Sequence, residues 1–236
     1  MNYSIFIRTY DKDYEWLVYC LRSLRIHAPQ ADVNVVSPHG FPESIFSTPN
    51  VRFWVVPSKH NEDGYVDQQI TKLLADTYCS SEYILHIDSD TVLIDDPQKL
   101  FIDGRPQMLR TPYAQVGEAI AWKSVTEKNL GWGVSHEYMR RLPLMYPRAL
   151  YERLRIHLNI THTKTFPEWA RAVPSHQLSE FNLLGAFAFE KMHDAFHWID
   201  TEVDPLPSVV AKQHWSWGGI TPDIKASLEA LCSPSG

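Results

Sequence analysis

The sequence predicts an α/β protein in which a mixed open sheet is flanked by helices within a single domain. Three observations support this fold class. Apolar, β-prone runs alternate with stretches of helical periodicity through residues 1–100. Hydrophobic residues make up 44% of the 236 residues, which is enough for one large core. The sequence shows no internal repeat and no low-complexity tract that would divide the chain.

The first hundred residues are expected to form four strands and two helices. A β-prone run at Ile5–Tyr10 opens the pattern. Apolar residues then recur at helical spacing from Leu17 to Leu24, until Pro29 ends the element. Further strands are predicted at 33–36, 51–56 and 83–87, with a polar loop at 60–64 and a helix at 66–78.

The second half of the chain is less regular. One helix is predicted at 147–158, beginning with a proline, and another at 179–189, capped by Ser179. A loop is predicted at 214–219, which ends in a glycine pair. Ligands of open α/β sheets bind beyond the carboxyl ends of the strands. The segments 8–10 and 88–90 each follow a predicted strand and are therefore the candidate binding segments.

Two aspartates stand directly after the apolar strand at 83–87. Side chains two residues apart on a continuing strand project to the same side, so Asp88 and Asp90 can converge. Two adjacent carboxylates repel each other, and both stay charged most easily when a cation lies between them. Their oxygens suit Mg²⁺ or Mn²⁺, whose open positions phosphate oxygens fill. The alternative is a plain turn, since aspartates often follow strands; Asp95-Asp96 is read in that way, as a turn or helix start.

Charge and cysteine content narrow the class of protein. A net charge of −6 argues against binding a nucleic-acid backbone. The three cysteines follow no metal-binding spacing and cannot all pair, so they are expected to be free thiols in a reducing compartment. No signal peptide and no apolar run of about 20 residues is found, so a cytoplasmic protein without a membrane span is expected. Residues 233–236 read as a tail or linker, which also fits one domain of a longer polypeptide.

Three segments of the chain resemble segments of a known family and occur in the same order along the sequence. "YILHIDSDTVLIDDP" (83–97) resembles the DxD segment of nucleotide-sugar glycosyltransferases with the GT-A fold. "DGYVDQQITKLLAD" (63–76) and "SHQLSEFNLLGAF" (175–187) are similar to two motifs of a little-characterised GT-A family, with Phe181 and Gly185 at the family's aromatic and glycine positions. That family includes glycosyltransferase domains of large algal viruses and bacterial relatives. The resemblance spans residues 3–219, and it implies one GT-A domain at 1–232, with a nucleotide- and metal-binding half at 1–100 and an acceptor half at 101–232.

The resemblance implies a metal site and a donor. Asp88 and Asp90 would hold Mn²⁺ or Mg²⁺ against the diphosphate of a nucleoside-diphosphate sugar, with Asp90 counted as catalytic and UDP the expected nucleotide. Ser89 would contact the ribose, and His214 would be the third metal ligand. Lys212 and Gly218, which lie near it in "AKQHWSWGGITP", would contact phosphate. L-Rhamnose is one candidate donor sugar, and the host cytoplasm would be the compartment if the protein is viral.

The nucleotide base is expected over the end of the first strand. Tyr10 would stack on it, Thr9 would form a hydrogen bond to it, and Arg8 would reach a base carbonyl or phosphate; the alternative is that Tyr10 packs on the first helix. Gln69 and Lys72 lie one helical turn apart and share a face. The resemblance implies that this face meets the nucleotide, whereas a lysine on a helix is otherwise a solvated charge.

The expected reaction is transfer of a sugar to a glycan hydroxyl. Inversion of configuration is the expected course, in which Glu180 is the base that takes the hydroxyl proton and Asn182 orients it or the donor sugar. If configuration is retained, Glu180 would instead position the acceptor. Trp132 and Trp215 are the candidate acceptor-side rings, although packing is the commoner role of such residues. Two rival classes stay open: a metal-dependent nucleotidyl- or phosphotransferase, and a glycan-binding module without catalysis.

Overall fold

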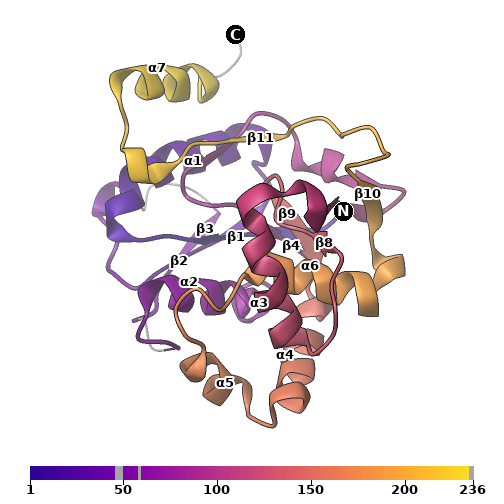
Figure 1. Ribbon diagram of the computed structural model, residues 1–236. Helices are drawn as coiled ribbons and strands as arrows, with labels where there is room; N and C mark the ends of the chain where they lie inside the picture. The colour runs from indigo at the N-terminus through magenta and orange to yellow at the C-terminus, as the bar shows by residue number, and fades with distance from the viewer. Residues whose placement is uncertain (46–49, 58–59, 234–236) are drawn as a thin grey trace.

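The computed structural model describes residues 1–45, 50–57 and 60–233 (Figure 1). Its centre is a five-stranded sheet with the order β3-β2-β1-β4-β9. The first four strands pair in parallel, and β9 runs antiparallel to β4. The predicted mixed α/β sheet flanked by helices is therefore confirmed. The strands of this sheet are β1 (Tyr3–Arg8), β2 (Asp32–Ser37), β3 (Val51–Val55), β4 (Tyr83–His86) and β9 (Leu144–Pro147).

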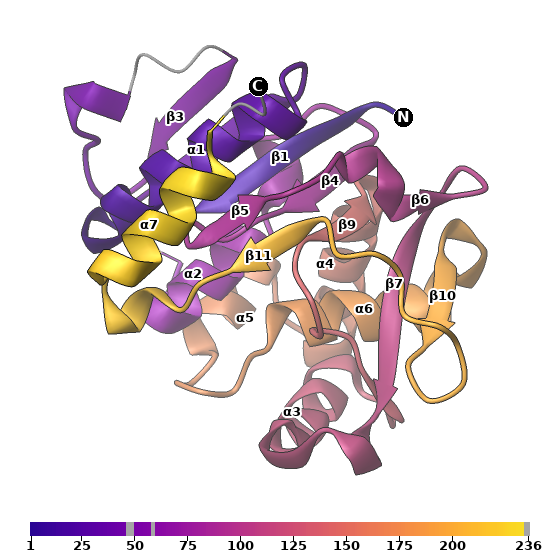
Figure 2. The same cartoon turned by 90° about the horizontal axis from the view of Figure 1, so that it is seen from above.

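Helices cover both faces of this sheet because the side chains of each strand alternate in direction. Ile5 and Ile7 pack on α1 (Tyr14–His27) in one buried cluster. Phe6, on the opposite face of the same strand, belongs to a second cluster that is covered by the other helices (Figure 2). Those helices are α2 (Gly64–Lys72), α3 (Ala121–Leu130), α4 (Ala149–His162), α5 (Phe166–Ala172) and α6 (Glu180–Lys191).

Smaller strand pairs extend the structure beside the main sheet. One group has the order β10-β7-β6, with β8 also pairing with β7, and β11 pairs with β5 in antiparallel fashion. The C-terminal helix α7 packs on α1 through a small cluster around Trp16 and Leu228. These elements are β5 (Thr91–Leu93), β6 (Phe101–Ile102), β7 (Arg105–Pro112), β8 (His136–Glu137), β10 (His197–Asp200), β11 (Ala211–Gln213) and α7 (Pro222–Leu231).

Several predicted boundaries are corrected. The helix expected at 66–78 ends as an α-helix at Lys72 and continues only as a 3-10 turn at 75–77. Pro147 does not begin a helix, because it is the last residue of β9 and α4 starts at Ala149. Ser179 precedes α6 as predicted, but its side chain makes no capping hydrogen bond. Asp96 caps a 3-10 helix by accepting from Gln98 N at 2.8 Å, which is the helix start expected there.

The cysteines and the absence of an apolar helix long enough to span a membrane can be compared with the prediction in the described part of the chain. All three cysteines are buried free thiols. Within the described ranges, no helix is long and apolar enough to cross a membrane. Of the tail predicted at 233–236, residues 234–236 lie outside the described residues.

Gly185 is a glycine because α6 lies directly against Tyr138. A methyl group built on Gly185 would overlap Cβ and Cγ of Tyr138, which is itself buried. We therefore expect Gly185→Ala to lower the free energy of unfolding by ~1–3 kcal/mol, the usual cost of overpacking. Urea unfolding measures this change. Gly133→Ala is the matched control, because its added methyl would meet only Glu127 Oε1, at an ordinary 3.8 Å; equal losses in the two variants would contradict the packing explanation.

Candidate functional site

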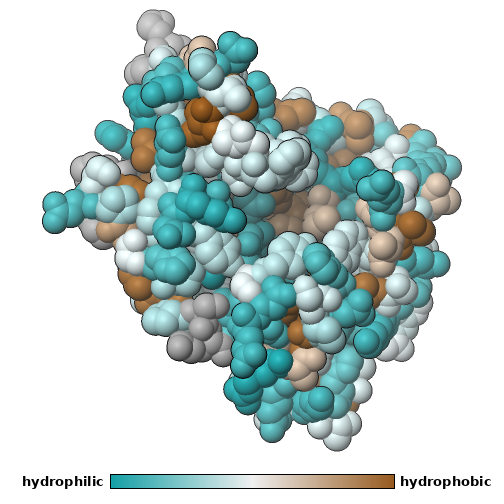
Figure 3. All heavy atoms as spheres, turned by 60° about the vertical axis from the view of Figure 1, so that its left-hand side comes forward, coloured by the Kyte–Doolittle hydropathy of each residue, from teal (hydrophilic) through white to brown (hydrophobic). Residues whose placement is uncertain are grey.

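A cavity of about 280 Å³ opens at the carboxyl edge of the central sheet. The face that carries it is hollowed in the middle below α7, and pale to brown residues form the floor between hydrophilic rims (Figure 3). The cavity walls come from α2, α3, α6, β11 and the turn after β4. The lining residues are Tyr65, Gln68, Gln69, Lys72, Asp88, Trp122, Met139, Leu142, Ser179, Glu180, Phe181, Gln213 and Trp215.

A buried lysine lies between two carboxylates in this cavity. Lys72 Nζ is 2.9 Å from Asp88 Oδ1 and 3.0 Å from Glu180 Oε1. Burial alone would lower the pKa of Lys72, but the charges of Asp88 and Glu180 outweigh burial and raise this pKa above its usual range. Lys72 is therefore charged, and it is not the solvated surface lysine of the alternative reading. Its ammonium also lies 4.7 Å from the centre of the Phe181 ring.

Gln69 completes the contacts of Glu180. Its Nε2 donates to Glu180 Oε2 and to Leu178 O, both at 2.9 Å. Gln69 and Lys72 do share the face of α2 that the sequence predicted, and that face meets the start of α6. Both oxygens of Glu180 therefore accept hydrogen bonds from α2, and the side chain is 5% exposed.

Asp90 is held by the segment after β11. Its Oδ2 accepts from Ser216 N at 3.0 Å and its backbone oxygen accepts from His214 N at 2.7 Å. Burial and the neighbouring carboxylate of Asp88 raise the pKa of Asp90 to about 6, although the bonds from Ser216 and Gln213 oppose this rise. An acid whose charged form is disfavoured in this way is a place where a cation would be favourable.

Asp13 is a third carboxylate in this neighbourhood, and it was not among the residues expected in the site. Its side chain makes no capping hydrogen bond. Burial raises its pKa, the charge of Asp88 adds to the rise, and a hydrogen bond from Ser216 offsets part of it. The turn after β1 thus brings another acid close to the Asp88–Asp90 pair. The signal available in the sequence was its position after the first strand, at the same edge of the sheet.

The backbone N–H of His214 donates to Asp90 O, but the His214 side chain does not form a ligand set with the acids. Its Nε2 is buried without a hydrogen-bond partner, and burial, together with Lys212, lowers the pKa of its ring, which keeps it neutral. Across the described part of the chain, no three His, Cys, Asp or Glu side chains are already gathered as a metal site. The imidazole ring of His214 packs on Trp16, with ring centres 5.9 Å apart. The donor types nevertheless fit a divalent ion, because two neighbouring carboxylates and a neutral imidazole suit such an ion, but the His214 ring would have to turn toward the acids to act as a ligand.

The residues expected to bind the nucleotide base lie outside the cavity. Arg8 is buried, its Nη2 is 3.5 Å from Asp67 Oδ2, and its guanidinium lies over the Tyr10 ring at 4.5 Å. Tyr10 itself donates its hydroxyl hydrogen to Gly64 O. Thr9 is buried at the end of β1. In this structure Arg8 supports Tyr10 from the inside, so a direct contact of Arg8 with nucleotide stays a prediction without support from its position.

The three remaining residues that were expected to contact ribose or phosphate lie in different surroundings. Ser89 is buried between the two aspartates. Lys212 is exposed and donates to Ser227 Oγ of α7 at 3.3 Å, and it does not line the cavity. Gly218 N donates to Trp215 O at 3.2 Å within the local turn. Because side chains alternate along β11, it is Gln213, next to Lys212, that enters the site, and sequence reasoning missed it.

The two candidate acceptor tryptophans are separated by the fold. Trp215 lines the cavity. Trp132 packs on His157 and Phe187, with ring centres 4.6 and 6.3 Å apart, and it does not line the cavity, so it belongs to the core on the other side of α6. Trp122, which was not considered, occupies the position on α3 that does face the cavity.

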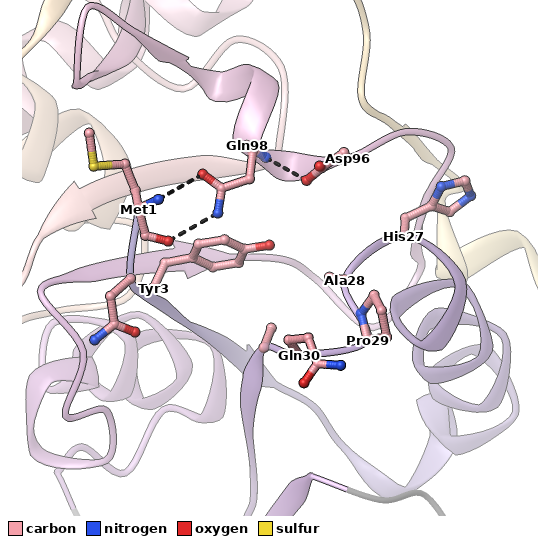
Figure 4. Close-up of a pocket in the computed structure, with 10 residues that line it drawn as sticks. Met1, Tyr3, His27, Ala28, Pro29, Gln30, Asp96 and Gln98 are labelled. Carbon is pink, nitrogen blue, oxygen red and sulfur yellow. Dashed lines mark hydrogen bonds between the residues drawn. The ribbon is translucent and has the colours of Figure 1, made fainter.

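A larger hollow of about 580 Å³ lies at the opposite end of β1, around Met1, Tyr3, His27 and Gln98 (Figure 4). Its one carboxylate lining residue, Asp96, is used to cap the 3-10 helix through Gln98 N. Met1 and Gln98 form two hydrogen bonds with each other. This hollow therefore lacks the converging charges found at the carboxyl edge, and the smaller cavity is the candidate site.

Comparison with solved structures places this geometry in a known fold. The galactosyltransferase LgtC, in complex with donor and acceptor sugar analogues, superposes with a TM-score of 0.59 at 12% identity, over 97% of this chain and 95% of LgtC. TarS of S. aureus gives a TM-score of 0.52 at 13% identity, over 98% of this chain and 39% of TarS. The fold is of the GT-A type. The apo form of the glycosyltransferase GlyE of Streptococcus pneumoniae TIGR4 also matches, with a TM-score of 0.50 at 9% identity, over 100% of this chain and 61% of GlyE.

At these identities the likeness concerns the GT-A fold alone. No protein-family model matches the sequence, and a search of curated proteins finds no match. The function is therefore argued from the residues of the cavity.

Proposed function

We propose that this protein is a metal-dependent glycosyltransferase that moves a sugar from a nucleoside diphosphate, with UDP as the expected nucleotide, to a glycan hydroxyl. One observation carries the proposal. On a GT-A fold, Asp88 and Asp90 follow the central strand β4, and Asp88 lines the cavity, where it is paired with Lys72, which Glu180 holds from the other side. This arrangement gives anchored acids where a diphosphate can approach.

Asp88 and Asp90 would hold the ion, with His214 as the third ligand. When bound, Mn²⁺ or Mg²⁺ would stabilise the negative charge of the departing diphosphate as a Lewis acid. The chain's own part is orientation. Ser216 N and His214 N fix Asp90 from the β11 side, and Lys72 fixes Asp88 from α2. The two acids are thus held by different elements, and an ion bound between them would neutralise their repulsion.

The contacts of Glu180 favour a positioning role over that of a base. A general base must be able to receive a proton, but both oxygens of Glu180 accept hydrogen bonds from α2, one of them from a lysine ammonium. Of the cavity-lining residues, Asp88 is the other acid, and it also contacts Lys72. A retaining transfer needs no protein base: as the acceptor oxygen bonds to the anomeric carbon and the bond to the diphosphate breaks, the diphosphate oxygen takes the hydroxyl proton. We therefore prefer the retaining alternative to inversion with Glu180 as base.

Glu180→Gln tests this choice. We expect kcat to fall by about tenfold to a hundredfold, because Lys72 loses one of its anchors, whereas the acidic limb of the pH–rate profile, which a general base would set, stays in place. Proton NMR of the product should show the anomeric configuration of the donor. An inverted product together with loss of the acidic limb in Glu180→Gln would restore Glu180 as the base.

The reaction class is tested by the products that the protein releases. Incubation with a panel of nucleoside-diphosphate sugars, including UDP-glucose, UDP-galactose and UDP-L-rhamnose, and Mn²⁺ should release nucleoside diphosphate and not pyrophosphate. Chelation should stop the release. Pyrophosphate release would favour the nucleotidyltransferase class. Sugar binding that needs neither metal nor nucleotide would favour a binding module.

A further inference from the structure

The cavity has two chemically different halves. All of its charged lining residues belong to one network, Lys72, Asp88 and Glu180. The other half is uncharged and consists of aromatic, apolar and amide side chains. Its members are Tyr65, Gln68, Trp122, Met139, Leu142, Gln213 and Trp215.

Two tryptophans in the uncharged half have no aromatic or hydrogen-bonding partner in the described part of the chain. Within residues 1–45, 50–57 and 60–233, neither Trp122 nor Trp215 is in ring contact with another aromatic side chain, and neither indole N–H donates a hydrogen bond. By contrast, Trp54 Nε1 donates to Asn34 Oδ1 at 3.1 Å. Indole rings that line a cavity and whose N–H groups make no hydrogen bond within the described residues are suited to a ligand with an apolar face and hydroxyl groups.

Trp215 is also anchored although it is 66% exposed. The residues on either side of it are tied to Asp90, through His214 N at 2.7 Å and Ser216 N at 3.0 Å. The ring is thus carried by a backbone segment fixed to the proposed metal ligand, so its position relative to the reacting centre is set.

The charge of the site restricts what that ligand can be. The single ammonium of Lys72 is shared by two carboxylates, and Asp90 and Asp13 add further acids nearby. The uncharged half contains no cation that could pair with an anionic group. A phosphorylated, sulfated or carboxylated sugar there would be repelled by the acids and would lose its hydration without compensation.

We propose that Trp122 and Trp215 form the acceptor subsite, and that it takes an uncharged glycoside whose pyranose ring stacks on these indoles. This inference rests on the proposed transferase function and names the acceptor class for it. Gln213 and Gln68 supply amide groups for the hydroxyls of such a sugar. The subsite selects against anionic acceptors through the charge of the neighbouring half.

Two probes that differ at one carbon test the selectivity. The neutral p-nitrophenyl β-D-glucoside and the corresponding glucuronide differ only in the carboxylate at C6. Saturation-transfer NMR with the whole protein, Mn²⁺ and UDP should show binding of the glucoside, with at least about tenfold weaker binding of the glucuronide. Absence of saturation transfer to the glucoside, or equal binding of both, overturns the proposal.

Substitutions test the residues. Trp215→Ala and Trp122→Ala should weaken glucoside binding about tenfold, which corresponds to ~1.4 kcal/mol, and should raise the acceptor KM about tenfold more than the donor KM. Trp217→Ala is the matched control, because Trp217 lies in the same turn, is 85% exposed and does not line the cavity. A rise confined to the donor KM would assign the rings to the nucleotide and overturn the proposal, as would an equal effect of Trp217→Ala. The NMR arm gives its result even if no donor is turned over, so failure of the proposed function is distinguishable.

Discussion

Lys72→Met should both destabilise the protein and abolish its activity. The substitution removes the only ammonium from a buried cluster and leaves Asp88 and Glu180 without a counter-charge. Removing one partner of a buried ion pair costs about 3–5 kcal/mol, since the remaining charge stays desolvated. Asp88 should also lose its fixed position, so donor-dependent release of nucleoside diphosphate should fall by at least about a hundredfold. Urea unfolding and the donor assay measure the two effects.

A second substitution separates lost charge balance from lost packing. In Lys72→Met with Glu180→Gln, one of the two uncompensated carboxylates is gone, so we expect the double variant to regain stability relative to Lys72→Met. Activity should not return with it. Lys123→Met is the surface control, because Lys123 Nζ is 3.9 Å from Glu127 Oε1 and its side chain is 42% exposed. Its loss should change the free energy of unfolding by under about 0.5 kcal/mol. A double variant less stable than Lys72→Met would contradict the proposed charge balance.

Asp90→Asn should abolish metal-dependent activity without unfolding the protein. Lewis-acid stabilisation of a leaving group supplies several kcal/mol, so we expect kcat/KM to fall at least about a thousandfold. The stability of the metal-free protein at pH 7.5 should not fall. The folded pKa of Asp90 is raised to about 6, so its charge opposes folding above the unfolded pKa, and asparagine removes that charge while its side-chain oxygen still accepts from Ser216 N.

The pH dependence of this effect has a defined sign. Below the unfolded pKa of an aspartate, about 3.9, the carboxyl group is protonated in both states and Asp90→Asn should be nearly neutral. The relative gain of the variant should develop as pH rises from about 4 to about 6, the window given by the raised pKa. Thermal unfolding of both proteins in chelator across this range checks the trend. A variant that melts well below the wild type at pH 7.5 would show that Asp90 is mainly structural.

The first half of the fold could be predicted because parallel strands that are buried on both faces read as continuous apolar runs. β1, β2 and β4 are of this kind, and Asp88 and Asp90 follow β4 at its carboxyl end, as the sequence predicted. The helical periodicity of α1 was clear for the same reason: its apolar residues form one buried face. Elements with fewer local signals were missed. β5 and β11 have three residues each, and they exist because distant segments pair.

The candidate site was only partly predictable, for a related reason. The sequence identified Lys72 and Glu180 separately, but they are 108 residues apart, and no local pattern predicts that one will neutralise the other. This contact also weakened the case for Glu180 as a base. Lys212 and Gln213 are neighbours on β11, and because successive side chains of a strand point to opposite faces, only Gln213 enters the cavity. The two tryptophans near α3 also differ in their surroundings: Trp122 lines the cavity, whereas Trp132 packs on His157.

Binding of Mn²⁺ to the purified protein in the presence of UDP tests the central claim most directly. Free Mn²⁺ gives an electron paramagnetic resonance signal that disappears on binding, so the stoichiometry and affinity can be titrated without any catalytic step. We predict about one UDP-dependent Mn²⁺ per chain, loss of this binding in Asp88→Asn and Asp90→Asn, and normal binding in Asp95→Asn, whose carboxylate instead pairs with Lys99 on the surface. Unchanged Mn²⁺ binding in Asp88→Asn and Asp90→Asn, or no binding by the wild type with any nucleoside diphosphate, would contradict the account.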